Sequence, residues 1–149
     1  MTEIDLAARK PFPPSGQYSF NGPNEPRTVR VARDWVACLL EVLGRPQLVE
    51  AAKLCTSEAV TNTYLHTRSR TIAVEVAVTE ARVIVFVKDD AGEKLLPTEL
   101  PEPSATRQRG RGLVLIAAYA EGWNVFQGSG RPKTVWFSLA EGQGDRCAP

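Results

Sequence analysis

A carboxylate and a carboxamide stand four residues apart in a segment with a helical pattern. Glu58 and Asn62 belong to residues 54–66, which read LCTSEAVTNTYLH. At about 100° per residue, both side chains fall on the same side of a helix. That side also carries Ala51, Leu54, Cys55 and Leu65, and the opposite side carries Glu50, Lys53, Thr56 and Ser57. Because a charge and an amide buried without partners are costly, we expect this pair to face a ligand and its metal ion.

The two side chains suit different parts of phosphate chemistry. The carboxamide oxygen of Asn62 can bind a hard cation such as Mg²⁺, which keeps several waters and bridges to substrate phosphates. Glu58, one helical turn earlier, can orient or deprotonate a nucleophile beside those phosphates. The pattern therefore favours phosphate transfer or hydrolysis.

Acidic residues also follow a strongly apolar segment. Residues 83–87 are apolar on both faces, which is typical of a strand near the centre of a sheet. Asp89, Asp90 and Gly92 come directly afterwards. A turn is the usual role of Asp-Asp-x-Gly. A buried carboxylate at this place could instead accept a hydrogen bond from the amino group of a base.

Two glycines precede a second apolar segment. Gly110 and Gly112 stand at the start of residues 113–120, which form a predicted helix. Bare backbone N–H groups and the helix dipole can bind a phosphate there. Three nearby arginines match phosphate geometry: Arg107, Arg109 and Arg111. The alternatives are a simple loop ending and a solvated basic loop.

The remaining pattern predicts the elements that must position these residues. Helices are expected at about 24–43, capped by Asn24 and ended by Gly44 and Pro46, and at 47–66 and 113–120. Strands are expected at 71–78, 83–87, 123–126 and 133–139, with a short edge strand near 17–20. Residues 93–109 are expected to form a long loop, which is usually functional or disordered. This order predicts one sheet with helices on one face.

Composition narrows the class of protein. The chain of 149 residues fits one domain, and its net charge of +1 gives no reason to expect nucleic acid or an acidic membrane as partner. It has no apolar run near the ~20 residues that span a bilayer. Its acidic first residues do not resemble a secretory signal. We therefore expect a cytoplasmic protein that binds neither nucleic acid nor membrane.

Four segments, in this order, resemble a known superfamily. They are residues 57–62 (SEAVTN), 87–92 (VKDDAG), 110–113 (GRGL) and 133–137 (KTVWF). The chain is similar over residues 25–140 to the Bergerat-type, or GHKL, ATPases shared by histidine kinases, Hsp90, DNA gyrase and MutL. In size and detail it most resembles the bacterial anti-sigma-factor serine/threonine kinases. These phosphorylate a small antagonist protein on serine.

The resemblance implies a fold and a division of the chain. The fold is an α+β two-layer sandwich with a mixed, mainly antiparallel sheet and helices on one face. The ATP-binding domain would span residues 26–140, between a flexible tail at 1–25 and a C-terminal tail at 141–149.

The resemblance also implies roles for individual residues, with ATP and Mg²⁺ as cofactors. Glu58 matches the general base and Asn62 the Mg²⁺ ligand. Asp89 matches the adenine-reading aspartate, with Asp90 as the alternative. The remaining matches are Gly92 in the first glycine box, Gly110, Arg111, Gly112 and Leu113 in the second, Thr134 in the last strand, and Arg109 or Arg107 at the γ-phosphate.

Some positions depart from the family pattern. Counted from Asp89, the first glycine box has Ala91 and Glu93 where glycines are usual; counted from Asp90, Gly92 fits and Lys94 does not. The single histidine, His66, lies inside the nucleotide helix, which excludes a complete histidine kinase. We expect a serine/threonine kinase acting on a STAS-type antagonist, with a sigma factor as a further partner and a homodimer as a possible assembly. The alternative is a non-catalytic binding protein for a sigma factor or antagonist.

Overall fold

The computed structural model describes residues 16–89, 111–126 and 133–141 of the chain. Its elements are β2 (Gly16–Pro23), α2 (Pro26–Val42), a 3₁₀ turn η1 (Pro46–Leu48), α3 (Val49–His66), β3 (Thr71–Val78), β4 (Arg82–Asp89), α4 (Arg111–Tyr119), β5 (Gly122–Phe126) and β6 (Thr134–Ala140). Within these ranges, no helix is long and apolar enough to cross a membrane.

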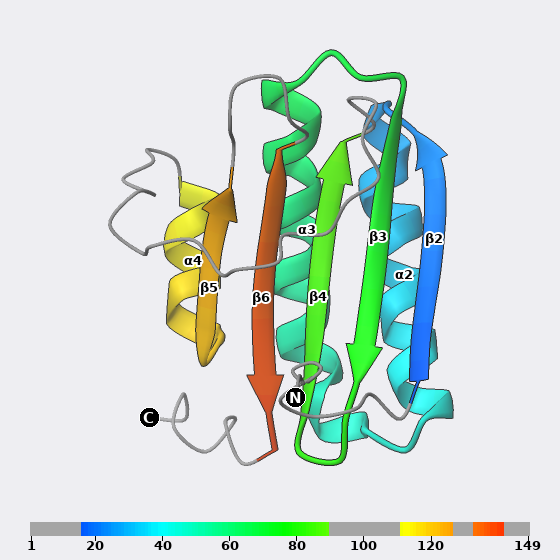
Figure 1. Ribbon diagram of the computed structural model, residues 1–149, viewed down its shortest axis with the longest axis vertical. Helices are drawn as coiled ribbons and strands as arrows, with labels where there is room; N and C mark the ends of the chain where they lie inside the picture. Colours follow the sequence, from blue (N-terminus) through cyan, green and yellow to red (C-terminus); the bar gives the residue numbers. More distant parts are fainter. Residues whose placement is uncertain (1–15, 90–110, 127–132, 142–149) are drawn as a thin grey trace, which may run out of the picture.

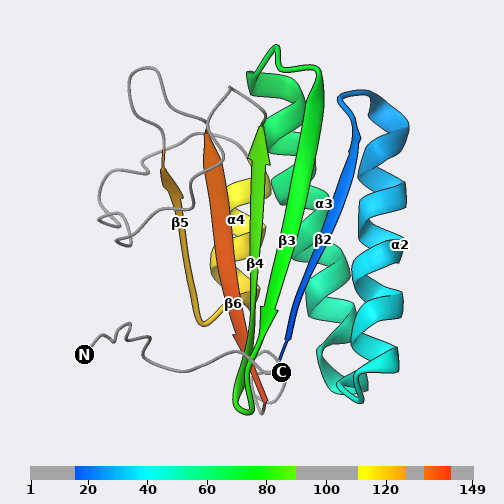
Figure 2. The same ribbon diagram turned by 45° about the vertical axis from the view of Figure 1, so that its right-hand side comes forward.

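The strands form one open sheet with the order β2-β3-β4-β6-β5 (Figure 1). The three α-helices of the described residues pack on one face of this sheet, which confirms the predicted α+β sandwich (Figure 2). Every strand pairing in the described sheet is antiparallel, so the parallel component of the expected mixed sheet is not found there.

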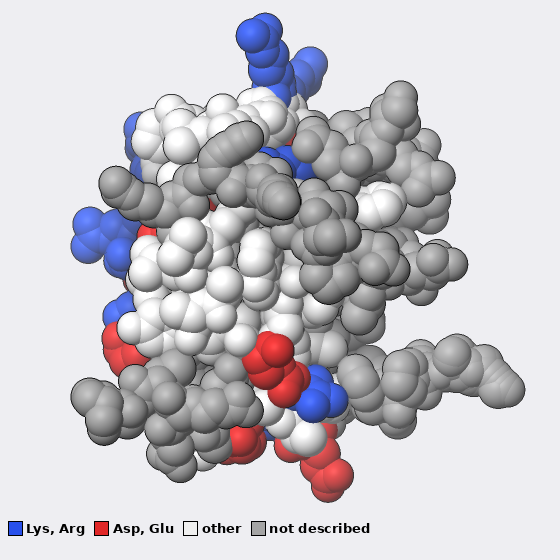
Figure 3. Space-filling model, turned by 90° about the vertical axis from the view of Figure 1, so that its left-hand side faces the viewer, with Lys and Arg blue, Asp and Glu red and all other residues white. Residues whose placement is uncertain are grey.

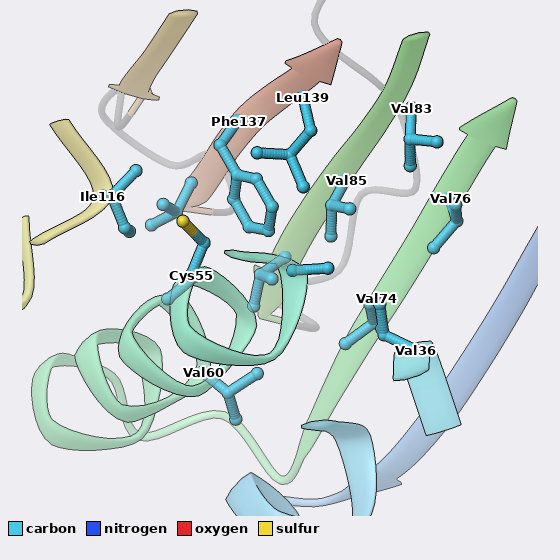
Figure 4. Packing of buried hydrophobic residues seen from close by; sticks show 14 of the residues in the cluster. Val36, Cys55, Val60, Val74, Val76, Val83, Val85, Ile116, Phe137 and Leu139 are labelled. Carbon is cyan, nitrogen blue, oxygen red and sulfur yellow. The ribbon is translucent and has the colours of Figure 1, made fainter. Parts of the chain in front are cut away.

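The core lies between the sheet and the helices, where every second residue of β3 and of most of β4 is buried. Val85 pairs with Val76 on one side and with Phe137 on the other, and all three are buried. Residues directly opposite one another in an antiparallel pair share one face. From the helix layer, Cys55, Val60 and Ile116 pack against this face (Figure 4).

Strand β2 is longer than the short edge strand expected near residues 17–20. It pairs with β3 along its whole length, from Gly16 opposite Val78 to Pro23 opposite Thr71. Phe20 faces the helices, where its ring centroid lies 5.6 Å from that of Trp35. This aromatic contact and the ladder to β3 order a segment that its prolines and glycines made difficult to predict.

The start of α2 differs from the prediction that Asn24 caps it. Glu25 is the N-cap residue, with extended backbone and no capping side-chain hydrogen bond, and Pro26 is the first helical residue. The side-chain Nδ2 of Asn24 instead donates to the carbonyl of Ser69, at 2.8 Å. Asn24 therefore ties the end of β2 to the segment before β3.

Helix α2 ends at Val42, two residues before Gly44, which the sequence predicts to stop it. Gly44 has a φ of +76°, which disfavours residues with a Cβ atom. Its N–H donates to the carbonyl of Glu41 at 3.1 Å, and the N–H of Arg45 donates to the carbonyl of Leu40 at 2.8 Å. These two bonds form a Schellman motif, which reverses the chain before η1.

Helix α3 lies between α2 and α4 and buries a wider arc than predicted. The arc is made of Ala52, Cys55, Thr56, Ala59, Val60 and Thr63. Thr56, expected on the solvated side, is fully buried, and Leu65, expected on the apolar side, is 64% exposed. The prediction was wrong at these two positions because α3 contacts the sheet and both neighbouring helices.

Candidate functional site

Four segments meet at one end of the sheet, the upper end in Figure 1. They are the C-terminal half of α3, the end of β4, the beginning of β6 and the beginning of α4. Helix α3 also contacts β4, β6 and α4 directly. The fold therefore brings together segments that lie far apart in the sequence and that carry most of the predicted site residues.

Glu58 and Asn62 lie on one flank of the buried arc of α3. Both are half-buried, and the helical repeat puts them on the same side as Cys55. In Figure 4 Cys55 points toward Ile116 of α4 and Phe137 of β6. Glu58 and Asn62 therefore lie on the flank of α3 nearer α4, and not on the flank nearer α2.

The side-chain oxygen of Asn62 is one of five buried side-chain polar atoms without a hydrogen-bond partner among the described residues; the others belong to Asn24, Arg45, Thr56 and Trp136. Oδ1 is buried, and no hydrogen-bond donor contacts it in the described structure. A buried carbonyl oxygen without a partner costs free energy, so it is normally paired with a protein group, water or an ion. This orphaned acceptor fits the predicted role of Asn62 as a ligand of Mg²⁺.

The described residues contain no cluster of three His, Cys, Asp or Glu side chains that could hold a metal ion. A single amide ligand is nevertheless enough for Mg²⁺, which prefers to keep its waters and to bind substrate phosphates. The donor set at Asn62 is therefore compatible with a metal ion held jointly by one side chain and a nucleotide.

Asp89 is the last residue of β4 and faces the helix layer. It pairs with Ile72 of β3, which is fully buried, and its N–H donates to the carbonyl of Lys133 at 3.3 Å. Only 9% of Asp89 is exposed. The carboxylate predicted to read a base is therefore buried on the face of the sheet that the helices cover.

Lys133 is a residue that the sequence prediction did not assign to the site. The alternation of β6 puts Lys133 on the same face as Val135 and Phe137, directly opposite Asp89. Lys133 is 6% exposed. Burial lowers the pKa of its ammonium group, and the charge of Asp89 opposes this shift. The ammonium and the carboxylate therefore interact within the site.

Thr134 lies on the other face of the sheet. It pairs with Lys88, whose Nζ lies 3.2 Å from Glu75 Oε2, whereas the helix-facing residues are Val87 and Val135. The structure therefore does not bring Thr134 to the face that carries Asp89. Continuing the alternation of Val135, Phe137 and Leu139 backward by two residues would have predicted from the sequence that Lys133 faces the helices, although not that it lies opposite Asp89.

Helix α4 begins at Arg111, with Gly112 in its first turn, as the glycine pattern predicts. Leu113 is buried in the core and contributes packing. The exposed residues of α4 include Val114, Ala117 and Ala118, and the middle of this side of the molecule is uncharged (Figure 3). The other predicted site residues, Asp90, Gly92, Arg107, Arg109 and Gly110, lie outside the described residues.

The opposite end of the sheet holds the junction between α4 and β5. Glu121 Oε2 accepts hydrogen bonds from Arg82 Nε and from Ser138 Oγ, each at 2.7 Å. Its N–H also donates to the carbonyl of Ser138 at 2.9 Å. These bonds connect the end of α4 to β4 and β6, and so help to fix the direction of the helix whose first turn reaches the site.

Comparison with known proteins agrees with this geometry. A search of curated proteins gives no significant match. The family model for the histidine kinase-like ATPase domain matches residues 22–139, a range that includes every described segment of the site. The chain therefore belongs to the histidine kinase-like ATPase domain family, which is a family of ATP-binding domains of the GHKL superfamily.

Proposed function

We propose that this protein is an ATP- and Mg²⁺-dependent serine/threonine kinase of the anti-sigma-factor type, whose substrate is a small STAS-type antagonist protein. The observation that carries the proposal is the buried, unpartnered Oδ1 of Asn62, one helical turn after Glu58. Family membership supports ATP binding, and the residue matches in α3 support a kinase.

The proposed chemistry uses two residues of α3 and an arginine. Asn62 Oδ1 would hold Mg²⁺, which would supply charge neutralisation on the phosphates. Glu58 accepts the proton of a substrate serine hydroxyl while the serine oxygen forms a bond to the γ-phosphorus of ATP. The bond between that phosphorus and the bridging oxygen breaks, and ADP leaves. Arg109, or Arg107, balances the charge of the γ-phosphate.

Two substitutions on α3 separate binding from transfer. Asn62→Ala should abolish Mg²⁺-dependent ATP binding, measured by isothermal titration calorimetry. Glu58→Ala should retain that binding and reduce phosphate transfer by about 100-fold or more, because a general base contributes about 10²–10⁴ in rate. Thr61→Ala, a half-buried position between the two, is the matched control and should leave both properties intact.

The transfer assay uses radiolabelled ATP and antagonist proteins encoded near the gene. Label should move to a serine of one antagonist with the wild-type protein and not with Glu58→Ala. ATP binding without transfer to any antagonist would contradict kinase activity.

A non-catalytic binding protein for a sigma factor or antagonist is the second candidate. Ala91 and Glu93, which stand where the family pattern has glycines, favour it. This candidate predicts no calorimetric heat and no thermal shift with ATP and Mg²⁺, and retained binding of the protein partner.

A further inference from the structure

Lys133 is a buried lysine beside Asp89, the predicted base-reading carboxylate, and the proposed function gives it no role. Asp89 ends β4 and Lys133 immediately precedes β6; continuing the register of the two strands by one residue puts them opposite each other, facing the helices. Side chains opposite one another on an antiparallel ladder have Cβ atoms about 4.5–5.5 Å apart. The pair therefore presents a hydrogen-bond acceptor next to a donor on one small area of the sheet.

The ammonium group of Lys133 is poorly hydrated. The residue is 6% exposed, and the loss of hydration lowers its pKa more than the attraction of Asp89 raises it. A buried charged group normally makes hydrogen bonds, because its lost hydration must be replaced. An ammonium group carries three donors, so Lys133 can interact with Asp89 and still donate to a ligand.

The chemistry of the pair matches one edge of adenine. The exocyclic 6-amino group of adenine is a donor, and the adjacent ring nitrogen N1 is an acceptor. Asp89 can accept from the amino group while Lys133 donates to N1. A 6-oxopurine such as guanine has an acceptor at position 6 and a donor at N1. Its N1–H would therefore face the ammonium donor of Lys133.

We propose that Lys133 is a specificity-determining residue that donates a hydrogen bond directly to N1 of adenine, beside Asp89. This assignment rests on the proposed ATP-binding function and adds a residue from the last strand to the site. Lys133 takes the helix-facing place next to Asp89, and Thr134 lies behind the sheet.

The test is a binding cycle with ATP and 1-deaza-ATP, which has carbon in place of N1. Affinities are measured by isothermal titration calorimetry on the full chain. Wild type should bind ATP about tenfold or more tightly than 1-deaza-ATP, because a hydrogen bond from a charged donor is lost. Lys133→Met should bind the two nucleotides equally.

Lys88→Met is the matched control, since Lys88 is the adjacent lysine and lies on the other face of the sheet with Glu75. It should keep the wild-type preference for ATP. A preference that persists in Lys133→Met would overturn the assignment, as would equal binding of the two nucleotides to wild type. The wild-type comparison gives an answer even where the variant fails to fold.

GTP provides a further comparison on the wild-type protein. It should bind more weakly than ATP, and tighter binding of GTP would overturn the adenine orientation. Absence of binding by every nucleotide would refute the proposed function together with this inference. Binding of ATP without discrimination at N1 would refute the inference alone.

Discussion

The charge of Lys133 makes the stability of the protein depend on pH. Burial lowers the pKa of Lys133 below its ordinary value of 10.5, and this effect exceeds the opposing attraction of Asp89. Between the lowered pKa and 10.5, the unfolded chain keeps a proton that the folded chain has lost. Stability contributed by this group therefore rises with pH in that interval, and the burial penalty is present in full at neutral pH.

Lys133→Met should consequently raise the free energy of unfolding near pH 7. The gain should shrink as pH rises toward 10.5, because wild type then loses the same charge. Urea unfolding of both proteins across this range measures the difference. Asp89→Asn should lower the pH at which the free energy of unfolding begins to rise. It removes the attraction that opposes the lowering of the Lys133 pKa by burial. A gain that does not change with pH would contradict this account.

The predicted metal position at Asn62 is not part of a cluster of metal-binding side chains within the described residues. Asn62 carries a buried oxygen without a donor and lies on the same side of α3 as Glu58. The neighbouring residues on α3, Ala59, Val60 and Thr63, are buried as ordinary packing groups. Within the described residues, the predicted metal position therefore rests on the unpartnered Oδ1 of Asn62.

At the scale of elements, the reversal between α2 and α3 depends on Gly44. Its φ of +76° lies in the left-handed region, and nothing lies within 4 Å of a Cβ added there. Gly44→Ala should therefore cost about 1–2 kcal/mol of stability from backbone strain alone. Gly44→Asn should cost less, because asparagine tolerates this conformation better. Equal stability of wild type and the alanine variant, measured by denaturant unfolding, would refute the role of the turn.

Helix α4 is held to the core by one face. Ile116 is fully buried against α3 and the sheet, whereas Val114 is 67% exposed. Ile116→Ala should lower the free energy of unfolding by about 2–5 kcal/mol through lost burial and a residual cavity. Val114→Ala, the matched control on the same helix, should change it by no more than about 0.5 kcal/mol. Similar losses for both variants would contradict the described packing of α4.

At the scale of the whole molecule, a ligand that binds only the folded chain should stabilise it. ATP with Mg²⁺ at 100 times its dissociation constant should add about 2.7 kcal/mol. For a chain of this length, each kcal/mol raises the melting temperature by roughly 2–4 °C. Differential scanning fluorimetry measures the shift. Asn62→Ala should lose the part that depends on Mg²⁺, and Thr61→Ala should keep it; an identical shift in all three proteins would argue against Asn62 as the metal ligand.

Much of the fold was predictable because its signals are local. Alternation in 71–78 predicted β3, the continuous apolar run at 83–87 predicted β4, and the glycine at position 44 predicted the end of α2. The same locality explains the errors. Asn24 has the right residue type for a cap, but its side chain bonds to Ser69, which comes close only after β2 joins β3.

The sequence by itself determined how Glu58 and Asn62 are placed on α3. They are four residues apart, and the helical repeat alone places them on one side, whatever surrounds the helix. Their predicted association with the acid at the end of β4 and with the glycines at the start of α4 follows from the order of the motifs. Family membership and the two-layer fold agree with these predictions.

Only the tertiary structure decided which side chains share the site with Asp89. Its neighbour across the ladder depends on the register between β4 and β6, and a shift of one residue would exchange Lys133 for Thr134. The buried arc of α3 likewise depends on α2, α4 and the sheet together. Helix geometry is a property of adjacent residues, whereas cross-strand pairing and burial arise from residues that meet only in the folded chain.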